Sequence, residues 1–551
     1  MAENGKPTWA DCLRNPESLA SRCGWSREAQ QRLLLSFLAV FLFGLAAHAY
    51  GFLRAGFSHD MLNALVTEPV ETYWKMQLGR PGIVLYRRVL RGLIAAPWQL
   101  GLLSLVWLSL SCFLITGLFR IPSRLFTVLV AGMLTANLSL TAMTATFLYE
   151  MDADLFAMLI GIGAVWLWDR GGWKGAFAGV LLIVFCVGTY QSMVSVPITL
   201  IMLCCCAALL RGEHFREVFR KGLRALVMLA LGGLLYWILV RLMCSWKGIN
   251  LAMDSYNNVL QTSSLSLFGR IAHAYATWAA AFFRPAQSHV EPFVLAVNLL
   301  LALLTGGLLL RWLLKGGAGA KEKLLFCVLL LLLPLGMNTA QLSFSRDVHD
   351  LMKTAFWLSG LPVLLLVFLG SEAKPASAAD SGLPAAGLFL SALLLFALFC
   401  ANIQTANVVY TRKNLEQNAA LSLMTRVLGR MEEREDYIPG ETVVVFAGVS
   451  DQLQDRIPGF EATYDITGCE ESSPIEKALT SYNYHVYAAY FRYILNNPAV
   501  LADSDVWNRM QQDARVRDMP CYPDAGCMQM LDGMLIVKLG ESPLYAEGVP
   551  G

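Results

Sequence analysis

The stretch LLLSFLAVFLFGLAAHAYGFL, residues 33–53, decides the class of this protein. It contains no charged side chain, and about 20 consecutive apolar residues span the hydrocarbon core of a bilayer as one helix. In the whole chain of 551 residues, 56% are hydrophobic and only 15% are charged. A soluble domain carries about 25% charged residues. The sequence therefore predicts a polytopic α-helical membrane protein.

Ten further apolar stretches follow this first one, so about eleven transmembrane helices are expected. They are predicted at residues 97–119, 125–148, 155–168, 175–190, 194–210, 223–243, 292–312, 324–341, 355–369 and 383–404. The fourth and fifth of the eleven are short, which is typical of spans that tilt little or pack inside a bundle.

Lysine and arginine predict the orientation, because short cytoplasmic loops carry an excess of both. With the N-terminal segment 1–32 in the cytoplasm, the inside loops contain Arg120, Arg124, Arg170, Lys174, Arg211, Arg216, Arg220, Lys221, Arg224, Arg311, Lys315, Lys321 and Lys323. One outside loop breaks the trend with Arg54, Lys75, Arg80, Arg87, Arg88 and Arg91. The balance still favours this orientation. An odd number of spans then makes 33–404 the transmembrane domain and 405–551 an extracytoplasmic domain.

The segments outside the spans divide into two kinds. Outer loops 54–96 and 245–289 have apolar residues at helical spacing with arginines on another face, which predicts amphipathic helices at the membrane surface. The tail is predicted to be α/β, because TVVVFAG at 442–448 and MLIVKL at 534–539 are typical of strands and 476–495 has helical periodicity.

The net charge and the cysteines bear on two further features, a nucleic-acid partner and a disulfide. The net charge is +2 and no basic tract occurs, so nothing indicates a nucleic-acid partner. Most of the thirteen cysteines lie in predicted spans, where cysteine packs as a small hydrophobe. In an extracytoplasmic tail Cys521 and Cys527 are able to form a disulfide, which would leave Cys469 unpaired.

Acidic and polar residues gather at the predicted outer ends of the spans. They comprise His59, Asp60, Glu150, Asp152, Asp154, Tyr190, Gln191, Asp347 and Asp350. Solvated turns are one interpretation of each residue alone. As a set, however, carboxylates between apolar helices are costly unless a cation or water satisfies them. Arg80, Arg87, Arg88 and Arg346 on the same side suit an anionic phosphate. The combination favours chemistry on a lipid-linked phosphate.

Several of these motifs, in this order, resemble the GtrII-type membrane glucosyltransferases, which have the GT-C architecture. They are Ser58-His59-Asp60, Gly79-Arg80, Tyr149 to Asp154, Thr189-Tyr190-Gln191-Ser192, a juxtamembrane helix at 402–430, Met519 to Pro523 and Leu535 to Leu539. The resemblance implies a bacterial enzyme that transfers a hexose, typically glucose, from a polyprenyl-phosphate sugar. The acceptor would be a surface polysaccharide or similar glycan on the outer face of the cytoplasmic membrane, and the expected outcome is inversion.

The resemblance also implies roles for individual residues. Asp60 would be the catalytic base, and Asp152 and Asp154 would bind acceptor hydroxyls, a metal or a water. Arg80 and Arg346 would hold the donor phosphate. His59, Glu150, Tyr190, Gln191 and Asp347 complete the predicted substrate site. The family often has two adjacent acids where this chain has His59-Asp60, so a magnesium or manganese ion on Asp60, Asp152 and Asp154 is left open, because histidine replaces a hard oxygen ligand.

Other interpretations stay open at this point. Asp60 could cap a helix, Arg80 could extend to the lipid headgroups, Tyr190 could belong to an aromatic belt, and Asp347 could pair with Arg346. A polysaccharide polymerase or ligase would use the same kind of donor but transfer a whole oligosaccharide. A lipid-sugar flippase would instead place polar residues near the bilayer midplane, whereas here they gather at one face.

Overall fold

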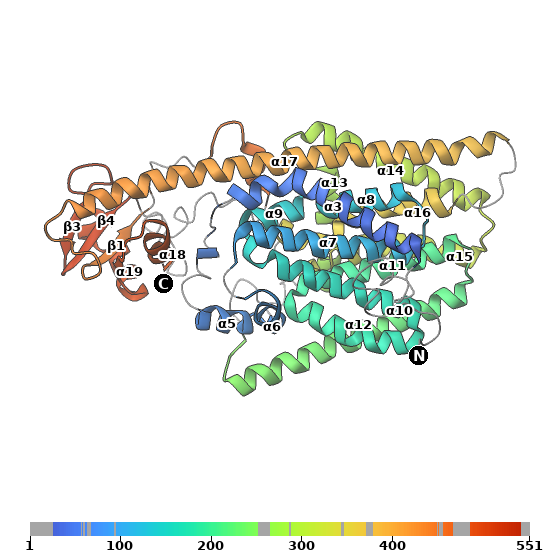
Figure 1. The fold of residues 1–551 in the computed structure, drawn as a ribbon, viewed down its shortest axis with the longest axis horizontal. Coiled ribbons are helices and arrows are strands. Elements are labelled where there is room, and N and C mark those ends of the chain that lie inside the picture. Colours follow the sequence, from blue (N-terminus) through green and yellow to red (C-terminus); the bar gives the residue numbers. More distant parts are fainter. Residues whose placement is uncertain are drawn as a thin grey trace, which may run out of the picture.

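The computed structural model describes residues 26–54, 56, 58, 61–62, 68–92, 95–251, 265–285, 288–342, 347–370, 378–448, 450, 456–466 and 485–541. These residues form a bundle of helices with a small sheet beyond one end (Figure 1). The bundle consists of α3 (Arg27–Arg54), α7 (Pro97–Phe119), α8 (Arg124–Thr135), α9 (Leu138–Thr146), α10 (Leu148–Thr189), α11 (Ser195–Leu210), α12 (Phe215–Lys247), α13 (Leu267–Phe283), α14 (Glu291–Lys315), α15 (Ala320–Met337), α16 (Leu361–Leu369) and the long α17 (Ala378–Glu432).

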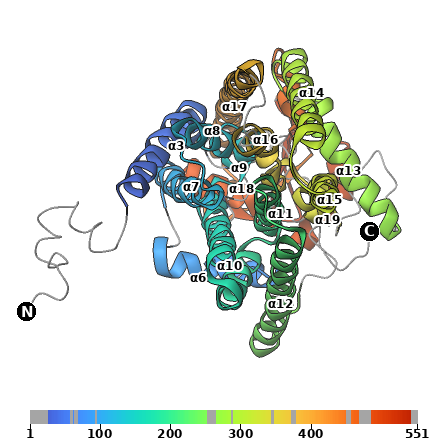
Figure 2. The ribbon, with the colours of Figure 1, turned by 90° about the vertical axis from the view of Figure 1, so that its right-hand side faces the viewer.

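Seven helical elements in the described chain are long and apolar enough to cross a membrane, and the bent pair α8–α9 would be an eighth. These apolar helices indicate a membrane protein. Each of the eleven predicted spans coincides with a helix, but α15 and α16 are not among the seven, so the count of eleven stays a prediction. Seen from the end, α11 lies in the middle of the other helices (Figure 2), and it is the most buried of the seven.

Helix α10 covers two of the predicted spans because it turns back on itself at Gly172. The φ of Gly172 is 58° and its ψ is −138°, a conformation outside the helical region. Beyond this turn the two arms pack together. A side chain at Gly161 would come within 3.0 Å of the Cys186 sulfur, and one at Gly179 within 3.3 Å of the Ala164 carbonyl oxygen. The arms are therefore antiparallel neighbours.

The third predicted span is broken. Helices α8 and α9 are bent by 43° at Ala136 and Asn137. Two amides compensate for the backbone bonds that the break removes. Asn137 caps α9 by accepting a hydrogen bond from the Leu140 N–H at 2.8 Å, and the Asn402 amide donates to the Ala136 carbonyl at 2.9 Å. Polar side chains thus stabilise the break inside the bundle.

The first outer loop is helical where it is described. It forms α5 (Glu68–Gln77), α6 (Pro81–Tyr86) and the π-helical turn η1 (Arg87–Arg91). Helix α6 lies directly against α10, because a Cβ at Gly82 would meet Thr189 Oγ1 and the Thr189 backbone nitrogen. Leu85, Val89 and Arg88 are exposed, whereas Arg87 is buried against α10. That these helices lie at the membrane surface stays a prediction.

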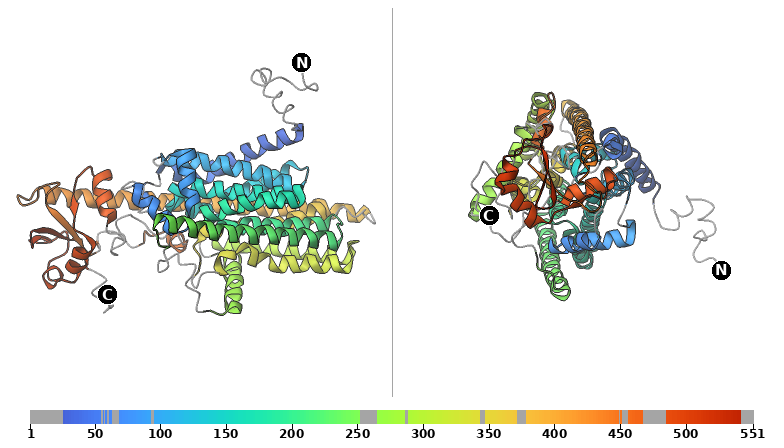
Figure 3. Two further views of the ribbon diagram at one scale, coloured as in Figure 1. Left: turned by 90° about the horizontal axis from the view of Figure 1, so that it is seen from below. Right: turned by 90° about the vertical axis from the view of Figure 1, so that its left-hand side faces the viewer.

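Helix α17 leaves the bundle and carries the sheet (Figure 3). The predicted juxtamembrane helix at 402–430 is therefore the continuation of the last span. The sheet has the order β2 (Val500–Leu501), β1 (Val443–Ala447), β4 (Met534–Lys538), β3 (Met528–Leu531). β1 is parallel to β2 and β4, whereas β3 and β4 form an antiparallel hairpin. β1 and β4 occupy the two stretches that the sequence predicted as strands.

Short helices complete the region around the sheet. These are α18 (His485–Ala489), the π-helical turn η7 (Tyr490–Ile494), α19 (Ser504–Gln512) and α20 (Ala514–Arg517). Trp507 and Gln511, one turn apart on α19, both donate to the Phe446 carbonyl at 3.0 Å. The core of this region includes Leu423 and Met424 of α17 and also Leu62 of the first outer loop, which is fully buried. Cys521 and Cys527 are free thiols.

An exposed ion-pair network on this region should weaken in acid. Arg515 contacts Asp513 at 2.8 Å and Asp532 at 2.6 Å, and its hydrogen bonds lower the pKa of both carboxyls. The stabilisation from these two ion pairs is present above the aspartate pKa of the unfolded chain, about 3.9. It is lost as the pH falls through the lower pKa values that the carboxyls have in the folded protein. Hydrogen exchange of the β3–β4 amides should therefore differ between the native protein and Arg515→Gln at pH 6 and converge below about pH 3. An equal difference at both pH values would contradict this.

Candidate functional site

The acidic motif lies in a helix and not in the tight turn that the sequence predicted. α9 ends at Thr146 and α10 begins at Leu148, so Phe147 alone links them. The Glu150 and Met151 N–H groups both donate to the Phe147 carbonyl at 3.0 Å. Helical structure is favoured here because acidic side chains are stabilising in the first turn of a helix. Glu150, Asp152 and Asp154 consequently have helical spacing.

This spacing separates the three carboxylates into two groups. Successive helix residues are about 100° apart, so Glu150 and Asp154 share a face and Asp152 points elsewhere. All three lie in the first turns of α10, where Glu150 and Asp152 contact basic residues on and next to α5, α6 and η1. The basic residues of these elements approach the start of α10 and divide among the carboxylates.

Glu150 is held by three cations. The Lys75 ammonium contacts its Oε1, the Arg87 guanidinium lies 3.5 Å from Oε1, and the Arg80 guanidinium lies 3.8 Å from Oε2. The four side chains are between 5% and 12% exposed. In such a dry position the charges require mutual compensation. Glu150 is therefore the counter-ion of the basic cluster Lys75, Arg80 and Arg87.

Asp152 has a different cation. Arg91 Nε lies 3.0 Å from Asp152 Oδ2, and neither side chain is exposed. Arg91 also donates to the Tyr149 carbonyl at 2.7 Å, and its guanidinium lies over the Tyr149 ring at 4.8 Å. The Tyr86 hydroxyl, which accepts a hydrogen bond from Trp107 at 3.0 Å, lies beside Asp152. Burial raises the pKa of Tyr86, so this phenol stays protonated.

Asp154 differs from both neighbours. It is 3% exposed, forms no ion pair with any residue that the structure describes, and its Oδ1 has no hydrogen-bond partner there. A buried carboxylate without a partner is costly. Such an atom in a native structure is a candidate for contact with a ligand. Asp152 Oδ1 also has no hydrogen-bond partner among the described residues, but Asp152 pairs with Arg91, so Asp154 is the acid of the three without an ion pair.

Arg80, Tyr190 and Gln191 form one wall beside these acids. Arg80 Nε donates to Gln191 Oε1 at 3.3 Å, and its guanidinium lies 4.6 Å from the centre of the Tyr190 ring. Gln191 in turn donates to the Leu78 carbonyl at 2.9 Å and to the Tyr236 hydroxyl at 3.1 Å. The structure therefore brings together six predicted site residues, which are Arg80, Glu150, Asp152, Asp154, Tyr190 and Gln191.

Of the remaining predicted residues, the structure describes only Asp347, which has another partner. Asp347 is 63% exposed on its side chain and contacts His273 Nε2 at 2.8 Å. His59, Asp60 and Arg346 lie outside the described residues. Ser58, two positions before Asp60, donates to the Thr146 carbonyl at 2.6 Å, directly before the helix that carries the acids. The roles predicted for these residues stay predictions.

Four residues of the site were not recognised as site residues from the sequence. Tyr86 and Tyr236 gave no signal, because each is one aromatic among many. Lys75 and Arg91 were counted only as loop charges. The i, i+4 spacing of Arg87 and Arg91 would have been informative, because it places both on one face of a helix.

The metal prediction has no support within the described chain. No group of three or more His, Cys, Asp or Glu side chains is arranged there to hold an ion. Asp60, one of the three expected ligands, is outside the described residues. Metal dependence therefore stays open as a prediction.

Comparison with known proteins gives one match. A family model described as Glucosyl transferase GtrII matches residues 50–340, more than half of the chain. No curated protein and no solved structure matches. The matched range contains α5, α6, η1 and α10, and thus the complete described cluster of acids and cations. The chain belongs to the GtrII glucosyl transferase family.

Proposed function

We propose that the protein transfers glucose from a polyprenyl-phosphate glucose donor to a glycan acceptor at the outer face of the cytoplasmic membrane. Family membership supports glucosyl transfer, and the apolar helices support a donor that is itself embedded in the membrane. The observation that carries the proposal is Asp154, a buried carboxylate with no ion pair in the described structure, beside a cluster of basic and aromatic side chains.

The reaction requires a base and an anion-stabilising environment. A carboxylate removes the proton from the acceptor hydroxyl, whose oxygen bonds to C1 of glucose while the C1–O bond to phosphate breaks. Polyprenyl phosphate leaves with the electron pair and its negative charge. Attack opposite the leaving group inverts the configuration at C1. The resemblance of the His59-Asp60 motif to that of the family assigns the base to Asp60, and Asp154 would bind and orient the acceptor hydroxyl.

The three acids of α10 would then have separate tasks. Glu150 pairs with Lys75, Arg80 and Arg87, and Asp152 pairs with Arg91. These two ion-paired acids hold η1 and α6 against α10. Asp154 faces the same space without such a partner. Arg80 and Arg346 are proposed to approach the donor phosphate, Arg80 from the wall that it forms with Tyr190 and Gln191.

The wider assignment follows from the charge pattern and the family. We propose a GT-C-like transmembrane domain at 33–404 and an extracytoplasmic domain at 405–551, with the N-terminus in the cytoplasm. The acids, the outer loop and the sheet all lie at one end of the bundle (Figure 1). This common location supports placing all of them on the same side of the membrane.

A transfer assay tests the proposal. The purified full chain in liposomes should move label from polyprenyl-phosphate [14C]glucose to a surface glycan, and each transfer should add the mass of one hexose. Heat-inactivated protein is the control. Addition of a whole oligosaccharide would identify a polymerase or ligase instead. Movement of the lipid between leaflets without any glycan product would identify a flippase.

A further inference from the structure

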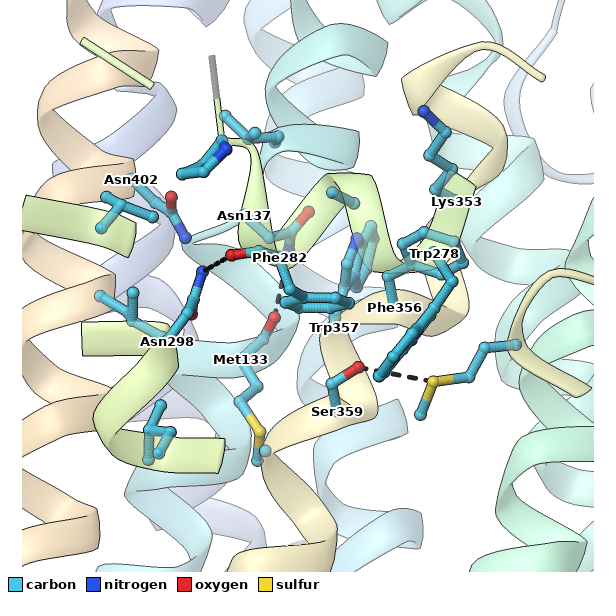
Figure 4. A pocket seen from close by; sticks show the side chains of 18 of the residues that line it. Met133, Asn137, Trp278, Phe282, Asn298, Lys353, Phe356, Trp357, Ser359 and Asn402 are labelled. Atoms are coloured by element: carbon cyan, nitrogen blue, oxygen red, sulfur yellow. Dashed lines mark hydrogen bonds between the residues drawn. The ribbon is translucent and has the colours of Figure 1, made fainter. Parts of the chain in front are cut away.

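A cavity of about 430 Å³ lies among α8, α9, α13, α14, α15, α16 and α17 (Figure 4). None of Glu150, Asp152 or Asp154 lines it. Its volume is within the range of about 300–1,000 Å³ that is typical of ligand sites. The cavity is therefore large enough for a ligand and separate from the acidic cluster.

The lining of the cavity changes along its length. Ser288, Asp350 and Lys353 lie at the end nearer the sheet, where α14 begins. A middle zone combines the amides of Asn137, Asn298 and Asn402 with aromatic rings, among them Trp278, Phe282 and Trp357 (Figure 4). The far end is mainly aliphatic, with Leu301, Leu330, Val363 and Leu395, and the Thr305 hydroxyl there donates to the Leu301 carbonyl at 2.6 Å. The cavity is thus charged at its mouth and apolar at depth.

Helix α14 gives the direction and length of the cavity. Val294, Asn298, Leu301, Ala302 and Thr305 line it at the spacing of one helix face. From the first to the last of these, the helix rises by about 16 Å. The opposite face of α14 is exposed, and only Val294, Val297, Asn298 and Trp312 of this 25-residue helix are buried. The inner face therefore borders unfilled, elongated space.

Lys353 provides a cation at the mouth. Its ammonium contacts Asp350 Oδ1 at 2.7 Å, and its side chain is 13% exposed. An ammonium has three donors, so two remain for another acceptor. A phosphate there would form a charge-assisted hydrogen bond. The mouth thus suits an anionic group that is attached to an apolar chain.

We infer that this cavity binds the isoprenoid chain of the donor lipid, with Lys353 contacting its phosphate. The lipid's identity rests on the proposed function, whereas the amphiphilic character of the site rests on the lining alone. A chain in this position would place the phosphate beside Lys353, and α9 contacts both the adjoining η4 (Asp350–Met352) and α10, which carries Asp154. Lys353 is then a phosphate contact that the sequence did not indicate.

Photo-crosslinking with a diazirine-bearing farnesyl phosphate tests this inference on the purified full chain. Ala302→Trp fills the cavity, whereas Leu303→Trp places the same ring on the exposed face of the same helix, where Leu303 is 72% exposed. We expect labelling to fall by about tenfold or more in the first variant and to stay unchanged in the second. Lys353→Met should weaken labelling by farnesyl phosphate about tenfold but not labelling by the uncharged farnesol probe.

Several outcomes would overturn the inference. One is equal labelling of both tryptophan variants, and another is equal competition by phosphatidylglycerol and polyprenyl phosphate, which would indicate a site for bulk phospholipid. If Ala302→Trp does not fold, peptide mapping of the wild-type adduct provides the test instead. Adducts on α14 or α17 support the site, and adducts on α3 or α12 contradict it. Labelling needs no turnover, so a protein that binds the probe but transfers no glucose would refute the proposed function alone.

Discussion

Replacing Asp154 with Asn should lower the rate of glucosyl transfer by about 10²-fold or more. The amide keeps the size of the side chain but neither carries the negative charge nor accepts a hydroxyl proton in the same way. Because no described residue forms an ion pair with Asp154, the substitution leaves no cation unpaired. The free energy of unfolding should stay the same or rise, since a buried charge is removed. Activity and stability would therefore separate at this position.

Two comparisons make this prediction specific. Asp60→Asn should reduce transfer at least as strongly, and the double variant should lose little more than either single one if both carboxylates serve the same proton transfer. Asp152→Asn, in contrast, should mainly destabilise, because it leaves buried Arg91 without its counter-ion. Transfer rates and thermal unfolding of the four proteins provide the test. Full activity in Asp154→Asn would exclude this residue from the reaction.

Most of the helical elements were predictable because hydropathy is a local property. All eleven apolar stretches are helical over most of their length, although 125–148 is divided between α8 and α9, because a helix satisfies the backbone polar groups of an apolar segment within a membrane. The break between α8 and α9 was not predictable. It depends on the Asn402 amide reaching the Ala136 carbonyl from a helix 266 residues later in the chain. Contacts over such a distance have no local signal.

The candidate site was predicted in composition but not in its pairing. The sequence placed the acids of 150–154 and Arg80 at one end of the bundle, and the structure brings them together. From the sequence, the arginines were assigned to a phosphate. In the structure, Lys75, Arg80 and Arg87 surround Glu150. The close approach of α6 to α10 at Gly82 determines which cations contact Glu150. The sequence indicates the charge of a site more readily than the pairing of its charges.

The second large effect is expected at Glu150, and it concerns stability. Glu150→Gln leaves Lys75, Arg80 and Arg87 close together without their shared carboxylate. Removing one partner of a buried ion pair costs about 3–5 kcal/mol, because the remaining charge is not compensated. The variant should unfold at a clearly lower temperature and bind donor poorly, since α6 and η1 would no longer be held on α10.

A matched variant and a rescue separate this electrostatic effect from a general effect of losing an acid. Glu213 pairs with Lys221 at 2.6 Å on a partly exposed surface, so Glu213→Gln should change stability by no more than about 1 kcal/mol. Adding Lys75→Met to Glu150→Gln removes the cation that contacts Glu150 most closely and should restore part of the loss, which a double-mutant cycle measures. If Glu150→Gln and Glu213→Gln were equally mild, the carboxylate would not hold the cluster together.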